Sequence, residues 1–137
     1  MGINVSRYFE NFNSLLILLV EVNLMNNYNK FQIVNTAKKT IRYIEKNTIN
    51  FPKDYFVLRN KIIESCYLIL ENIYRANISQ NIDDKKEIIV QIEMLNFYLE
   101  ESLKKKLLTN KKFVKYGEHL LELDLMVMSW MNNEKSK

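Results

Sequence analysis

The chain contains 137 residues, of which 47% are hydrophobic and 26% are charged, with a formal net charge of +4, two glycines and one proline. This length suits one domain, and the composition excludes disordered, collagen-like and low-complexity proteins. The shortage of glycine and proline also excludes folds that need many tight turns or a glycine-rich phosphate loop. We therefore expect a mostly helical domain.

The first 25 residues follow the pattern of the rest least well, and we treat residues 1–25 as an N-terminal extension. Their apolar run, Leu15–Val20, is shorter than the roughly 20 residues that a membrane-spanning helix needs. The segment could form an extra apolar helix on the domain or be disordered, and Met25 could be the natural start. A signal peptide is the less favoured alternative. Arg7 precedes the apolar run, as a signal peptide requires, but no small-residue cleavage site follows the run.

The clearest break in the chain is at Pro52, because proline forces the preceding residue out of the helical conformation and suits a first helical turn. Before it, apolar residues recur every three or four positions between basic residues, which predicts an amphipathic helix over about residues 28–47. After it, a wider apolar stripe that includes Tyr67 and Tyr74 predicts a helix over about residues 53–77. We expect this second helix to be the most buried.

Two further helices are predicted in the second half. The pair Asp83–Asp84 favours a helix start, because acidic side chains are stabilising at the positive end of the helix macrodipole. The apolar stripe that follows predicts a helix over about residues 83–107. Thr109 or Asn110 can cap a fourth helix, which we expect to end near Met131.

Four helices of this length joined by short loops predict an all-α, up-down-up-down four-helix bundle. We assign the bundle to residues 26–132 and a polar tail to residues 133–137. The extra N-terminal apolar segment would add to this bundle.

The sequence offers no set of residues for a catalytic or metal site. Cys66 is the only cysteine and His119 the only histidine, so neither an internal disulfide nor a zinc site of the Cys/His type can form. His119 with Glu118 and Glu122 resembles half of a di-iron motif, but such a site needs a second half from another helix. We expect no enzymatic activity, no cofactor, no membrane segment and a cytoplasmic location.

The order of several short motifs is shared with a known family. Phe51-Pro52-Lys53 closes the first helix, and Leu70-Glu71-Asn72-Ile73-Tyr74-Arg75-Ala76-Asn77 lies in the second. Leu107-Leu108-Thr109-Asn110-Lys111-Lys112-Phe113 opens the fourth, and Trp130 near its end is the last shared residue. Through these residues the chain resembles the Avd-like four-helix-bundle family. That family includes the accessory variability determinant of bacterial diversity-generating retroelements and, as a sister branch, proteins encoded within ribosomal RNA intervening sequences.

The resemblance covers about residues 28–131 and has functional implications. Leu68 to Ala76 lacks the proline and glycine of the intervening-sequence branch, which favours the Avd branch. The resemblance implies a homopentameric ring of bundles that binds a reverse transcriptase and RNA or DNA. It implies no catalytic residue in the bundle.

Basic residues are concentrated in the first two predicted helices, whereas the two signs of charge balance after Gln80. In a ring of several copies such a basic stripe is multiplied, and counterion release on phosphate binding becomes substantial. We predict that nucleic acid is bound by Lys38, Lys39, Arg42, Arg59, Lys61 and Arg75.

Other interpretations of these residues stay open. The basic stripe could be a solvated helix face, in which case the bundle would only scaffold protein partners. A second cluster of lysines lies between Lys104 and Lys115. These cations could stabilise the negative C-terminal end of a helix rather than bind a ligand. We interpret the eight tyrosines as core and interface residues rather than as platforms for bases.

Overall fold

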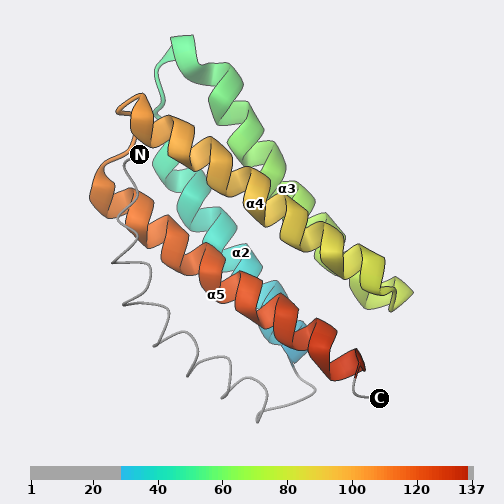
Figure 1. Cartoon of the computed structure of the whole chain (residues 1–137). Coiled ribbons are helices and arrows are strands. Elements are labelled where there is room, and N and C mark those ends of the chain that lie inside the picture. Colours follow the sequence, from blue (N-terminus) through green and yellow to red (C-terminus); the bar gives the residue numbers. More distant parts are fainter. Residues whose placement is uncertain (1–28, 136–137) are drawn as a thin grey trace.

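The computed structural model describes residues 29–135, and in this part of the chain four long helices lie side by side (Figure 1). The elements are α2 (Asn29–Thr48), the short 3-10 helix η1 (Lys53–Tyr55), α3 (Phe56–Ser79), α4 (Ile82–Lys104) and α5 (Asn110–Lys135). The predicted extension, residues 1–25, lies outside the described residues.

The four helices close into a square around one core. α3 packs against both α2 and α4, and α5 packs against both α4 and α2. Each helix runs antiparallel to the next in sequence (Figure 1), which confirms the predicted up-down-up-down four-helix bundle. As a consequence, the α2–α3 link and the α4–α5 link lie at the same end of the bundle.

The core is one apolar stripe from each helix, with members three or four residues apart, as an amphipathic helix requires. Burying each isoleucine, leucine or valine side chain of this core contributes about 1.5–3 kcal/mol to folding. The innermost residues are Ile33, Ala37, Ile44, Ile62, Ile69, Ile73, Ile88, Ile92, Leu95, Leu99, Leu120, Leu123 and Val127.

The break at Pro52 is confirmed, and the two sides of it are held by short-range contacts. Phe51 is buried and its N–H donates to the carbonyl of Thr48 at 3.2 Å. The carbonyl of Pro52 accepts from the N–H of Tyr55 at 2.8 Å, which forms η1 and leads directly into α3.

The link between α3 and α4 is very short and uses side chains suited to helix ends. Gln80 closes α3 in the left-handed conformation, with φ of 58°. Asn81 caps α4, because its side-chain oxygen accepts from the N–H of Asp83 at 2.9 Å. The predicted start at Asp83 is therefore within one residue of the observed one.

The end of α4 differs from the prediction, because the helix stops at Lys104 rather than near Leu107. Lys106 takes a positive φ of 61°. Its N–H bonds to the carbonyl of Leu103 at 3.0 Å, and the N–H of Leu107 bonds to the carbonyl of Ser102 at 2.9 Å. These two bonds form the helix-ending motif that usually has glycine at the left-handed position.

The start of α5 confirms one predicted cap, and its end is later than predicted. The hydroxyl of Thr109 accepts from the N–H of Lys112 at 3.2 Å, as a capping residue does. α5 continues to Lys135 instead of ending near Met131, because neither glycine nor proline stops the helix between these residues. The first part of the predicted polar tail is thus helical.

The expectation that the second predicted helix is the most buried is wrong. Tyr67 and Tyr74 of α3 are 50% and 42% exposed, and α5 contributes more buried residues than α3. The apolar stripe of α3 is wider than the face that α2 and α4 cover, so its edge is left in contact with solvent.

Tyr116 provides a test of the core. It is fully buried, its ring packs edge-on against Tyr43 with centroids 5.4 Å apart, and its hydroxyl has no hydrogen-bond partner. We expect Tyr116→Phe to raise the free energy of unfolding by about 1 kcal/mol, because it removes an unsatisfied buried hydroxyl and keeps the ring. Urea denaturation measures this, with Ile73→Ala as the control that loses about 2–5 kcal/mol. A loss of stability in Tyr116→Phe would contradict the assignment.

Candidate nucleic-acid interface

α2 carries a marked excess of positive charge. Its sequence contains five cations and a single carboxylate, Glu45. Lys39, Arg42 and Lys46 are exposed and Lys38 is half-buried. Because only one face of α2 enters the core, its four cations between Lys38 and Lys46 lie on the remaining surface.

The predicted binding residues of α2 lie on two different flanks of the helix. Lys38 and Glu45 share the flank toward α3, since Glu45 accepts a hydrogen bond from Tyr67 there and residues seven apart are separated by close to two helical turns. Lys39 lies on the flank toward α5, where its charge lowers the pKa of His119. The structure therefore places Lys38 toward α3 and Lys39 toward α5, while Arg42 lies about one turn from each and between the two flanks.

Two of the predicted residues of α3 lie in ion pairs along their own helix. Lys61 Nζ lies 3.8 Å from Glu64 Oε2, and Arg75 Nη2 lies 3.7 Å from Glu71 Oε1. All four side chains are more than half exposed, and such pairs are worth about 0–1 kcal/mol. A phosphate can therefore compete for either cation.

Arg59 is placed differently from the other predicted residues. Its guanidinium carbon lies 5.4 Å from the centre of the Phe56 ring, within the range of a cation–π contact. Its Nε is buried without a hydrogen-bond partner, while the residue as a whole is half-buried. The side chain is thus held against an aromatic ring at the start of α3.

One hydrogen bond joins the α2 surface to α3. The hydroxyl of Tyr67 donates to Oε2 of Glu45 at 3.0 Å. This bond and the negative charge of Glu45 raise the pKa of Tyr67. The contact fixes an exposed tyrosine ring beside the cations of α2, whereas the sequence predicts a core or interface residue at this position.

A second cationic surface forms at one end of the bundle, and we call it the lysine end. Its members come from the last turn of α4, the α4–α5 link and the first turns of α5, and all are exposed. They are Lys104, Lys105, Lys106, Lys111, Lys112 and Lys115.

The macrodipole explains only part of the lysine end. Lys104, in the last turn of α4, is favourably placed, because cations are stabilising at a helix C-terminus. Lys111 and Lys112 lie in the first turn of α5, which has no acidic residue, and there each cation costs about 0.3–1 kcal/mol. Within α5, helix stability does not account for these two lysines.

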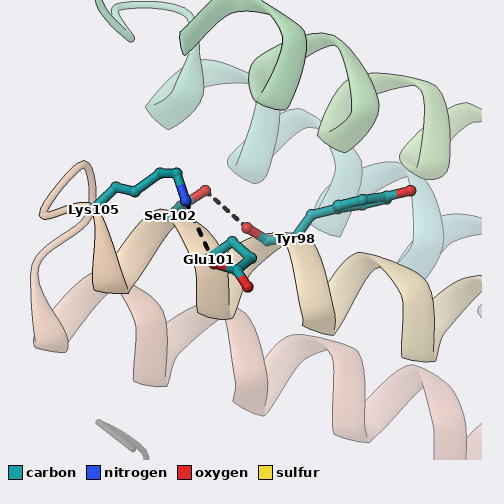
Figure 2. A network of polar contacts seen from close by, with 4 residues as sticks. All are labelled: Tyr98, Glu101, Ser102 and Lys105. Atoms are coloured by element: carbon teal, nitrogen blue, oxygen red, sulfur yellow. Dashed lines mark hydrogen bonds and ion pairs between the residues drawn. The ribbon is translucent and has the colours of Figure 1, made fainter.

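Figure 2 shows the polar contacts at the end of α4. Lys105 Nζ lies 3.5 Å from Glu101 Oε2, and the hydroxyl of Ser102 donates to the carbonyl of Tyr98 at 2.9 Å. Glu101 therefore balances one charge of the lysine end, while the buried serine satisfies its hydroxyl within the helix.

The described residues provide no arrangement for metal or nucleophilic chemistry. Among residues 29–135, no three histidine, cysteine or acidic side chains gather as metal ligands would. Burial raises the pKa of the Cys66 thiol to about 12, so the nucleophilic thiolate is not populated near neutral pH. Burial and, less strongly, Lys115 lower the pKa of His119.

No helix in the described range, residues 29–135, combines the length and the apolar character that crossing a bilayer requires. No protein-family model matches the chain, and no curated protein sequence matches it significantly.

Asp124 provides a test of the electrostatics on the opposite side of the bundle. Burial and, secondarily, Glu93 raise its pKa from 3.8 to about 6, and its Oδ1 is buried without a hydrogen-bond partner. Because the folded state holds the proton more tightly than the unfolded chain does, the resulting stability is present below about pH 4 and is lost as the pH rises to about 6.

We expect Asp124→Asn to remove this part of the pH dependence. At neutral pH the substitution should raise the free energy of unfolding by about 1 kcal/mol, a value reduced for the partial exposure of the carboxyl. Urea denaturation of both proteins at a series of pH values measures the effect. Parallel stability profiles of the two proteins would contradict the shifted pKa.

Proposed function

We propose that the protein is a non-enzymatic, homo-oligomeric adaptor that binds RNA or DNA and a reverse transcriptase, as the accessory protein of a bacterial diversity-generating retroelement. The observation that carries the nucleic-acid part is the charge of α2. Five cations stand there against Glu45, the only carboxylate of the helix, which is engaged by Tyr67.

The electrostatics of α2 suit a polyanion better than a small ligand. Among the described residues, neither Lys39 nor Arg42 has a carboxylate partner within ion-pair distance, and both are exposed. Each cation that meets a phosphate releases condensed counterions, so affinity should fall steeply with salt. Repetition of α2 around an oligomer multiplies this effect.

The lysine end supports the same proposal. Lys111 and Lys112 occupy the end of α5 where cations are unfavourable for the helix, and a phosphate partner is a ligand that such a surface would attract. The bundle topology places this surface at the end where α2 terminates and α3 begins (Figure 1).

The assembly and the polymerase partner rest on the resemblance to the Avd-like family, with one supporting observation. Val90, Met94 and Phe97 lie on one face of α4 at spacings of four and three residues, and they are between 39% and 50% exposed. This apolar row lies on the side of α4 opposite its core stripe. A contiguous exposed apolar face is typical of a protein–protein contact.

The alternative function is a scaffold that binds only proteins. The apolar row of α4 favours it, and the cations would then serve solubility. The two functions differ in their salt dependence, because only phosphate binding releases counterions in proportion to the cations engaged.

We expect the variant Lys38→Glu/Lys39→Glu/Arg42→Glu to lose nucleic-acid binding. Removing about three phosphate contacts and adding repulsion should lower affinity by at least about tenfold at low salt and flatten the slope of affinity against salt. Titration of a labelled RNA at two salt concentrations, followed by fluorescence anisotropy, measures both.

The matched control is Lys111→Glu/Lys112→Glu/Lys115→Glu, which changes the net charge by the same amount. It should weaken binding less, while its melting temperature rises, because acidic residues suit the N-terminal turns of α5. Unchanged RNA affinity in the α2 variant would remove α2 from the proposal.

We expect the protein to be an oligomer in solution, a pentamer according to the resemblance. Met94→Glu/Phe97→Glu should shift the mass toward the monomer, because charge in an apolar contact is strongly unfavourable. Size-exclusion chromatography with light scattering measures the mass, and Val57→Glu, on an exposed position of α3, is the control. A wild-type monomer would exclude the ring.

A further inference from the structure

Three exposed aromatic rings form a row along one side of α3. Phe56, Tyr67 and Tyr74 are 41%, 50% and 42% exposed. They are separated by eleven and seven residues, which are close to three and two whole helical turns. The three side chains therefore leave α3 in nearly the same direction, and we call them the aromatic row.

The aromatic row faces the edge between α2 and α3. Tyr67 donates a hydrogen bond to Glu45 of α2, which fixes the relative positions of the two helices at this level. Tyr74 lies seven residues after Tyr67, and Lys38 lies seven residues before Glu45 on the antiparallel helix. Lys38 is therefore level with Tyr74, since both helices rise by about 1.5 Å per residue.

Cationic side chains lie next to the aromatic row at several levels along the bundle. Arg42 lies one turn from Glu45, between the levels of Tyr67 and Tyr74. At the other end, the guanidinium of Arg59 lies against the ring of Phe56. Aromatic rings and cations thus alternate along one edge of the bundle.

This pattern suits one class of nucleic acid. Bases in a duplex are stacked on one another and expose only their edges, whereas single strands offer base faces to aromatic side chains. The rings of Tyr67 and Tyr74 start about 10 Å apart along α3, much farther than the roughly 3.4 Å between bases stacked in a strand. Only a strand with separated bases can use both rings.

We propose that the aromatic row is a stacking platform for the unpaired bases of single-stranded RNA or DNA. Lys38, Arg42 and Arg59 then contact the phosphates of that strand, and the bond to Glu45 holds the Tyr67 ring in place. This inference rests on the proposed nucleic-acid binding and adds to it the form of nucleic acid and the residues that recognise it.

The test compares three labelled probes of about 15 nucleotides, a length near the upper site sizes of single-strand binders. The probes are a single strand, its duplex, and an abasic strand with the same number of phosphates. Anisotropy titrations use the wild type, Tyr67→Leu/Tyr74→Leu, and the control Met128→Ala, which changes a comparably exposed apolar side chain on α5. Circular dichroism checks that each variant keeps its helices.

We expect the wild type to bind the single strand at least about fivefold more tightly than the abasic strand, because each stacked base contributes substantially. The double variant should lose at least about fivefold in affinity for the single strand and keep its affinity for the abasic one. The control should behave as the wild type.

The outcomes separate this inference from the function on which it rests. Equal affinities for the single and abasic strands, or an unchanged double variant, would overturn the stacking platform and leave electrostatic binding in place. Absence of binding to every probe at low salt would instead overturn the proposed nucleic-acid function, and the stacking platform with it.

Discussion

Each of the four helices can bury only one face, and the closure of these faces around the isoleucine and leucine core sets the position of all other groups. In α2 the buried face is defined by Ile33, Ala37 and Ile44. Because α2 packs mainly against α3 and α5 among the described helices, the surface that these two leave uncovered carries its cations. The same packing that stabilises the fold therefore presents a basic surface, and no separate element is needed to build it.

The positions of the helices could be predicted from apolar spacing, from Pro52, from the acidic pair Asp83–Asp84 and from the cap at Thr109, because these signals are local. The end of α4 could not be predicted, since Lys106 adopts a left-handed conformation without the glycine that usually signals it. The exposure of the Tyr67 side chain could not be predicted either, for a different reason. A sequence shows how wide an apolar stripe is, but only the packing shows how much of it the neighbouring helices cover.

The candidate site was predictable in composition but not in arrangement. Segregation of charge identified the basic residues of the first two helices, yet Lys38 and Lys39 are adjacent in sequence and lie on opposite flanks of α2. The pairing of α2 with α3 is fixed by contacts such as that of Tyr67 with Glu45, and this register cannot be derived from either helix alone. The lysine end likewise depends on topology, which brings the ends of α4 and α5 together.

Positive and negative charges are concentrated on opposite edges of the four-helix bundle. The edge between α2 and α3 carries Lys38 and Arg42, whereas the opposite edge, between α4 and α5, carries Glu93 and Asp124, whose mutual repulsion contributes to the raised pKa of Asp124. Away from the lysine end, these charges would make the first edge more favourable for a polyanion than the second. Since the apolar row of α4 lies away from the basic edge, a protein partner and a nucleic acid would meet different sides of the bundle, and binding of one would leave the surface for the other accessible.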